Sequence, residues 1–183
     1  MKDVYLFAGS FDPPTLGHLE VVNEFFRQRK KENVKARLII LCSLNPEKKL
    51  SRWFNEIESK RLWKKYYKLS SSTRVLTNDE LANNRHLRNR IIHLIRGLRE
   101  GQDQLEEFKL SLLENDRERR ALIIKEATHV FTNPEFSHIS SSRLRALICQ
   151  GNMKEAKEFV PSAMIPVLGR RFNQISTQLE MKF

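Results

Sequence analysis

Residues 9–18 read GSFDPPTLGH, and they follow directly after the apolar run VYLFA at Val4–Ala8. A short apolar run of this kind indicates a buried strand. Thr15 is a suitable N-cap for a helix that opens around His18, and the first amides of a helix attract anions. A histidine at that position can donate a hydrogen bond to a phosphate. The stretch therefore predicts a strand, a loop and a helix that together bind an anion, with a plain strand–helix connection as the alternative.

Apolar runs rich in Val, Ile and Leu recur along the chain and alternate with helix-like stretches. The runs are Val4–Ala8, Ala36–Cys42, Thr73–Leu76, Ile91–Ile95 and His129–Phe131. The helix-like stretches are Gly17–Lys31, Phe54–Leu69, Asp79–Asn89, Asp103–Arg119, Ser141–Gln150 and Met153–Phe159. Short buried strands that alternate with helices are typical of a parallel sheet covered on both faces. We therefore expect an α/β fold with a doubly wound, Rossmann-like, parallel five-stranded sheet and helices on both faces.

The loops after the predicted strands hold the polar residues, and ligands of doubly wound sheets bind beyond the carboxyl ends of the strands. Lys48 follows the second strand, and Arg96 and Arg99 flank Gly97 at the end of the fourth. Two guanidinium groups suit phosphate or carboxylate. After the fifth strand, Ser140–Ser142 precede a helix, where hydroxyls and amides form a second anion site. Each loop alone has a plain structural explanation, but their position on one edge favours a functional site.

The chain is strongly basic. Its 183 residues include 33 Lys and Arg against 22 Asp and Glu, which gives a net charge of +11. Such a field attracts anions, so nucleic acid, anionic membrane and phosphorylated metabolites are all compatible partners. No apolar run approaches the roughly 20 residues that span a bilayer, and we expect a cytoplasmic protein. Cys42 and Cys149 lie in apolar runs and are predicted to be buried thiols rather than a disulfide or a metal site.

GSFDPPTLGH, IRGLR and HISSS, in this order and spacing, resemble the nucleotidyltransferase superfamily with the T/H-x-G-H motif. The chain is most similar to the phosphopantetheine adenylyltransferases, a branch that IRGLR and ISSS select. The resemblance implies a nucleotidyltransferase domain over residues 1–161 and a helical extension of the same domain over residues 162–183. It also implies transfer of AMP from ATP to 4′-phosphopantetheine, giving dephospho-coenzyme A and pyrophosphate. Mg²⁺ is the implied cofactor, bound mainly through the ATP phosphates.

The resemblance assigns roles by motif position. The implied catalytic residues are His18, Lys48 and Arg99. The implied ATP-binding residues are Ser10, Phe11, His18, Gly97, Arg99, Glu107, Phe136, Ser140, Ser141 and Ser142. The implied substrate-binding residues are Ser10, Lys48, Leu81 and Arg96. No protein residue is implied as a metal ligand. The implied partners are ATP and phosphopantetheine, with a homo-oligomer (a hexamer), feedback by coenzyme A, and neither membrane nor nucleic acid.

Two alternatives stay open. The doubled proline of DPPT is similar to the nicotinate mononucleotide adenylyltransferases, although IRGLR argues against that acceptor. The charge of +11 and the basic stretch Arg52–Leu69 favour a nucleotide-fold protein that has become a nucleic-acid-binding module. The set of phosphate-binding residues on one edge opposes that second alternative, because a pure binding module has no need of them.

Overall fold

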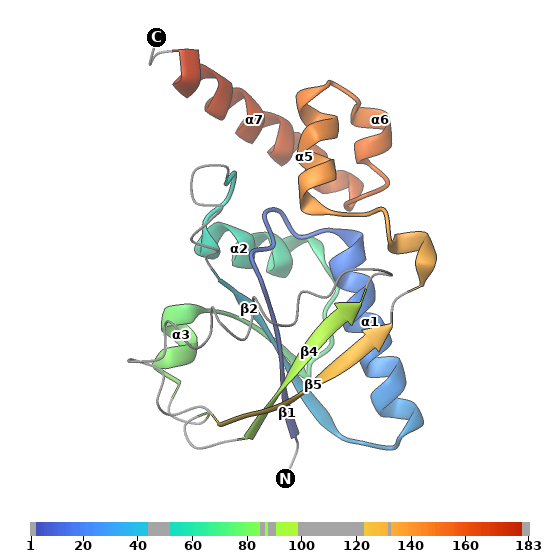
Figure 1. Cartoon of the computed structure of the whole chain (residues 1–183). Coiled ribbons are helices and arrows are strands. Elements are labelled where there is room, and N and C mark those ends of the chain that lie inside the picture. Colours follow the sequence, from blue (N-terminus) through green and yellow to red (C-terminus); the bar gives the residue numbers. More distant parts are fainter. Residues whose placement is uncertain are drawn as a thin grey trace.

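The structure, a computed structural model of the chain, describes residues 3–43, 52–84, 87, 91–98, 123–131 and 133–180. Its strands are β1 (Asp3–Gly9), β2 (Ala36–Cys42), β3 (Thr73–Thr77), β4 (Ile91–Leu98) and β5 (Ile123–Phe131). All pairings are parallel, and the sheet has the order β3-β2-β1-β4-β5 (Figure 1). The chain winds outward from β1 to β3 and then returns to the other side of β1. The predicted Rossmann-like parallel α/β architecture is confirmed. The direction in which successive strands are added reverses after β3, so β1 and β4 are neighbours at the switch point of the sheet.

The side chains of β1 alternate between two hydrophobic cores. Tyr5 and Phe7 belong to the core that also holds the inner faces of α1 (Leu16–Lys31) and α2 (Glu56–Tyr66). Val4 and Leu6 belong to a second core, which includes Leu81 of α3 (Asn78–Ala82). This alternation is the period-two geometry of a strand. Helices therefore pack on both faces of the sheet, as predicted.

Several predicted boundaries change. The helix predicted over Asp79–Asn89 ends at Ala82, where two successive asparagines, poor helix formers, follow. The fifth strand begins at Ile123 rather than His129, because Ile123 pairs with Ile91 while the charged Lys125 and Glu126 interrupt the apolar pattern. The fourth strand continues to Leu98 and so includes part of IRGLR. The helix predicted over Asp103–Arg119 lies outside the described residues.

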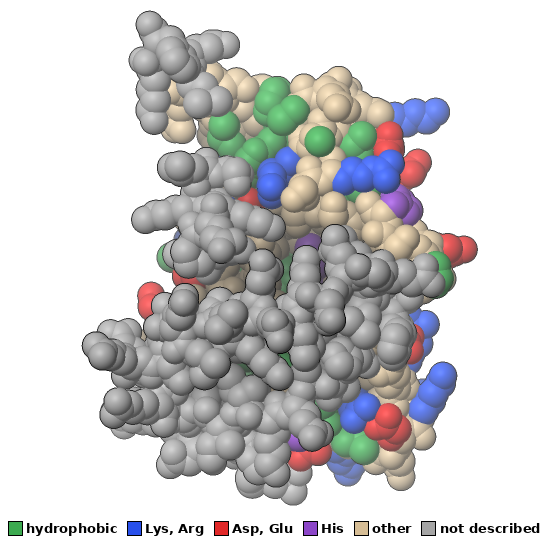
Figure 2. All heavy atoms as spheres, in the orientation of Figure 1, with side chains coloured by type: hydrophobic (Ala, Val, Ile, Leu, Met, Phe, Trp, Pro, Cys, Tyr) green, Lys and Arg blue, Asp and Glu red, His purple; other side chains and the backbone are tan. Residues whose placement is uncertain are grey.

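Three helices lie beyond the carboxyl ends of the strands: α5 (Ser141–Cys149), α6 (Met153–Ala156) and α7 (Ile165–Glu180) (Figure 1). Phe159, Met164 and Leu168 are completely buried there and join the larger core. Figure 2 shows Lys and Arg side chains on this face near the start of α5, and mixed acidic and basic side chains along α1. Among the described helices, none has the length and apolar character needed to cross a membrane.

The two cysteines differ in exposure. Cys42 ends β2 and is buried, as predicted, and burial raises the pKa of its thiol to about 12. Cys149 is exposed, so the prediction that it is buried was wrong. It is the last residue of α5, a helix that turns Leu147 and Ile148 toward the core and leaves the following residue in solvent. Both thiols are free.

Candidate active site

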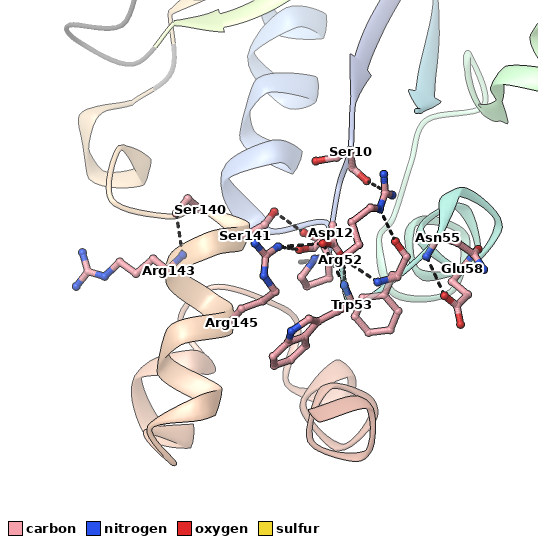
Figure 3. Close-up of polar contacts among 12 residues, drawn as sticks. Ser10, Asp12, Arg52, Trp53, Asn55, Glu58, Ser140, Ser141, Arg143 and Arg145 are labelled. Carbon is pink, nitrogen blue, oxygen red and sulfur yellow. Dashed lines mark hydrogen bonds and ion pairs between the residues drawn. The ribbon is translucent and has the colours of Figure 1, made fainter. Parts of the chain in front are cut away.

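Three segments that are far apart in the sequence meet at the carboxyl end of the sheet. They are the loop 10–15 after β1, the segment 52–55 before α2, and the start of α5 (Figure 3). The first turn of α1 also contacts the segment after α6, because the Leu16 N–H donates to the Phe159 carbonyl at 2.7 Å. The predicted strand–loop–helix unit is therefore present, and distant parts of the chain hold it in place.

Phe11 gives the loop its shape. Its φ is 44°, a left-handed conformation that is rare for a bulky residue and is found preferentially at functional sites. The ring is 1% exposed and packs edge-on against Phe7 and Trp63, with centroids 5.2 and 5.4 Å apart. A side chain at Gly9 would meet this ring at 3.0 Å. A side chain at position 9 would therefore fit only if the Phe11 ring moved, and only the main chain of Phe11 is available to a ligand in this conformation.

His18 is oriented by the threonine three residues before it. The Thr15 N–H donates to Nδ1 of His18 at 3.1 Å, and Thr15 Oγ1 lies 2.9 Å from the same nitrogen. A ring nitrogen that accepts from an N–H carries no proton, so the neutral imidazole holds its proton on Nε2. The Phe11 ring packs edge-on against the imidazole at 5.1 Å. The motif thus fixes both the tautomer and the plane of His18, with an N–H donor on its other nitrogen.

Asp12 is a buried carboxylate that connects two loops, and the sequence analysis did not single it out. It is 3% exposed. Oδ1 accepts from the N–H groups of Trp53 (3.0 Å) and Phe54 (2.7 Å). On the other side, Arg145 Nη1 of α5 forms an ion pair with Oδ2 at 3.0 Å and also donates to the Asp12 carbonyl (Figure 3). Burial raises the pKa of Asp12, and the Phe54 N–H and then Arg145 oppose that shift.

Arg52 joins the ends of β1 and β2. Its guanidinium donates to the carbonyls of Phe54 (3.0 Å), Ser43 (3.2 Å) and Ser10 (3.5 Å). The Ser43 N–H also donates to the Gly9 carbonyl at 3.0 Å, so the two strand ends remain bonded to each other. Three carbonyl acceptors from three positions define one location for the fork-shaped guanidinium. The basic stretch predicted from Arg52 onward therefore begins with a residue that acts on the site.

Two of the three serines at the start of α5 form side-chain hydrogen bonds within the protein. Ser140 Oγ accepts from the Arg143 N–H at 3.1 Å, which is the N-cap arrangement considered as a plain explanation. Ser141 Oγ donates to the Pro13 carbonyl at 2.7 Å and so ties the helix to the loop. Ser142 is exposed. Two of the three hydroxyls thus position the loop and the helix, and the Ser142 hydroxyl and the N–H groups of Ser141 and Ser142 are the groups that an anion could meet.

The remaining predicted residues fall into four groups. Phe136 lies in the 3-10 helix η2 (Pro134–Phe136) and packs on the larger core. Leu81 is 4% exposed in the second core, so a ligand would meet its main chain rather than its side chain. Arg96 and Gly97 lie in β4 and pair with β5 through their backbones. The other predicted residues lie outside the described residues: Lys48, Arg99 and Glu107.

The described residues contain no group of three or more His, Cys, Asp or Glu side chains that could hold a metal ion. The one carboxylate inside the loop, Asp12, is already bound by two N–H groups and Arg145.

Comparison with known proteins agrees with this geometry. The family model described as Cytidylyltransferase-like matches residues 6–147, a range that starts in β1 and ends in α5. Phosphopantetheine adenylyltransferase of Clostridium botulinum (strain Hall) is 29% identical over 168 residues, covering 92% of this chain and 94% of its own. The enzyme of that name from Streptococcus mutans is 28% identical over 169 residues, covering 91% of this chain and 92% of its own.

Among solved structures, the Plasmodium falciparum nicotinic acid mononucleotide adenylyltransferase complexed with APC aligns with a TM-score of 0.55. The alignment covers 96% of each chain at 14% sequence identity. A likeness at this identity shows a shared fold and does not identify the acceptor substrate.

Proposed function

The chain belongs to the Cytidylyltransferase-like family, and we propose that it transfers AMP from ATP to 4′-phosphopantetheine. The products are dephospho-coenzyme A and pyrophosphate. Two relatives named phosphopantetheine adenylyltransferase support this acceptor, because their similarity covers more than nine tenths of the chain. The stretches IRGLR and ISSS, which select this branch, also support it.

The orientation of His18 is the observation that carries the proposal. The N–H of Thr15 occupies Nδ1, so the imidazole holds an N–H on Nε2 at the first turn of α1. A fixed N–H donor next to helix amides suits the negative charge that grows on the α-phosphate during transfer. We assign His18 to that charge, and the main chain at Ser10 and Phe11 to the nucleotide phosphates.

The reaction needs no protein nucleophile. An oxygen of the 4′-phosphate attacks the α-phosphorus of ATP in line, and a new P–O–P bond forms. The bond from the α-phosphorus to the oxygen that bridges to the β-phosphorus breaks, and its electron pair leaves with pyrophosphate. The protein contributes by aligning the two phosphates and by neutralising their charge.

The roles of residues outside the described part rest on motif position. We propose that Lys48 and Arg99 contact the phosphates and that Glu107 contacts ATP. Arg96 is proposed to bind the phosphate of the acceptor, together with Ser10 and the main chain at Leu81. Gly97, Phe136 and the three serines before α5 are proposed to line the nucleotide. Mg²⁺, bound through the ATP phosphates, would supply further charge neutralisation.

The family resemblance also suggests assembly and regulation. We propose a homo-oligomer, a hexamer, whose activity coenzyme A inhibits because it contains the product structure. Sedimentation of the purified protein with and without coenzyme A, with activity measured in parallel, tests both statements. A monomer that is active and insensitive to coenzyme A would overturn them without affecting the assignment of the reaction.

The experiment that tests the reaction is pyrophosphate release from ATP and Mg²⁺, with 4′-phosphopantetheine and nicotinate mononucleotide as parallel acceptors. Release with phosphopantetheine alone is the expected result. Release with nicotinate mononucleotide alone would move the chain to the neighbouring branch of the superfamily. A folded protein that binds ATP but releases no pyrophosphate with either acceptor would overturn the proposal. A gel shift whose nucleic-acid affinity falls steeply with salt would then identify a binding module.

A further inference from the structure

The C-terminal helix α7 contacts the loop segment next to the site through two consecutive residues. Arg171 forms an ion pair with Glu58 of α2, and its guanidinium carbon lies 4.9 Å from the centre of the Phe54 ring. Phe172 stacks on the Trp53 indole, with centroids 6.0 Å apart and planes at 28°. One turn of α7 therefore holds two consecutive side chains of the segment before α2.

Trp53 and Phe54, whose side chains contact α7, also bind Asp12. The side chains of Trp53 and Phe54 face α7, whereas their N–H groups donate to the Asp12 carboxylate at 3.0 and 2.7 Å. Asp12 is 3% exposed, so its carboxylate depends on donors from the protein in this conformation. A buried carboxylate that loses its donors is strongly destabilised. The loop after β1 and the segment before α2 are therefore held together as one unit.

Arg52, the residue before them, extends the same connection to both strand ends. It donates to the carbonyl of Phe54 within the segment and to the carbonyls of Ser43 and Ser10 at the ends of β2 and β1. A displacement of the segment would thus move or break contacts to Ser10 as well as to Asp12. In the sequence, the segment directly follows the stretch that carries Lys48.

We propose that Arg171 and Phe172 of α7 are positioning residues for the transfer reaction. They lie beyond the family match at residues 6–147, and they act on the site through Trp53, Phe54 and Asp12 without touching the reacting groups. The inference rests on the proposed function. In-line phosphoryl chemistry depends steeply on alignment, and a misplacement of about 1 Å can cost about 100-fold in rate.

The test compares Arg171→Met with Arg170→Met. Both changes remove one charge from α7, but Arg170 is exposed and forms no ion pair with any described residue. With ATP and 4′-phosphopantetheine, Arg171→Met should lower kcat by about tenfold while KM for ATP changes less than about twofold. Arg170→Met should match the parent chain. Arg171→Lys, which keeps the ion pair, should recover most of the lost kcat.

Hydrogen exchange provides a readout that does not depend on activity. The amides of Trp53 and Phe54, and those of loop 10–15, should exchange faster in Arg171→Met and unchanged in Arg170→Met. Equal kcat and equal exchange in the two variants, or a lower melting temperature with unchanged kcat, would overturn the positioning role. If the parent chain itself shows no transfer, the proposed function fails, and the exchange comparison still decides whether α7 orders the loop.

Discussion

Two residues, Phe11 in the loop after β1 and His18 in the first turn of α1, are held in particular conformations by their neighbours. Phe11 is held at a φ of 44° by rings packed around it, and His18 is held in one tautomer by the Thr15 N–H. Unusual backbone conformations of this kind persist where surrounding structure over-determines them. At the scale of single residues, Phe11 and His18 are thus held in place by their neighbours, and groups fixed in advance are what electrostatic stabilisation of a transition state requires.

Replacing His18 by alanine removes the N–H donor assigned to the α-phosphate. We expect His18→Ala to lower kcat by about 100-fold or more, because a positioned donor of this kind typically contributes that much. Pyrophosphate release at saturating ATP measures it. Asn23→Ala, an exposed change on the same helix, serves as the control and should keep the parent kcat. Unchanged turnover in His18→Ala would remove the role assigned to this residue.

At the scale of secondary structure elements, α5 and the segment before α2 both bind the Asp12 carboxylate. Arg145 supplies the cation and Trp53 and Phe54 supply the N–H groups. Ser141 and Tyr67 add hydrogen bonds to the carbonyls of the two prolines, each at 2.7 Å. The loop between β1 and α1 is therefore shaped by α5 and by the residues on either side of α2.

The ion pair between α5 and the loop should matter more for stability than its neighbour on the same helix. Arg145→Met leaves the 4%-exposed Asp12 side chain without its cation and should lower the free energy of unfolding by about 3 kcal/mol. Arg143→Met removes a pair whose Arg143 side chain is 50% exposed and should cost less than about 1 kcal/mol. Urea denaturation of the two variants measures the difference. Equal losses would show that the Asp12 pair is no stronger than a surface pair.

Cys42 at the end of β2 and Cys149 at the end of α5 should differ in thiol reactivity. Burial raises the pKa of Cys42 to about 12 and also blocks access to it, whereas Cys149 is exposed. Because the thiolate is the reactive form, we expect one thiol per chain to react with a disulfide reagent in buffer and two in denaturant. Mass spectrometry of the labelled peptides identifies which one reacts first. Rapid labelling of Cys42 in buffer would contradict the buried position of the strand end.

At the scale of the whole molecule, the net charge of +11 should act on the rate at which ATP arrives. We expect kcat/KM for ATP to fall severalfold between about 0.05 and 0.5 M KCl, since salt screens the attraction between a basic protein and an anionic substrate. The value of kcat at saturating ATP should change much less. A kcat/KM that is independent of salt would show that the positive charge plays no part in substrate capture.

Much of the molecule could be predicted from the sequence, and the exceptions share a cause. The strands, the first helix and the phosphate loop are local patterns, so periodicity and the residues from Gly9 to His18 indicate them. The ion pair of Arg145 with Asp12 joins residues 133 positions apart, and no local pattern reveals it. The role of Gly9 could not be predicted from the sequence either. The Phe11 ring lies close to Gly9 only because the backbone of Phe11 is left-handed, and no local pattern indicates that conformation.

The bond from the Leu16 N–H to the Phe159 carbonyl has a consequence for how the protein is made. A ribosome releases the first loop early, but Arg145 emerges 133 residues after Asp12, and Phe159 emerges later still. A nascent or prematurely terminated chain can form the first strands while it lacks the groups that shape the loop. Fragments that end before Arg145 therefore lack the cation that pairs with Asp12, and we expect them to bind nucleotide more weakly than the 183-residue chain.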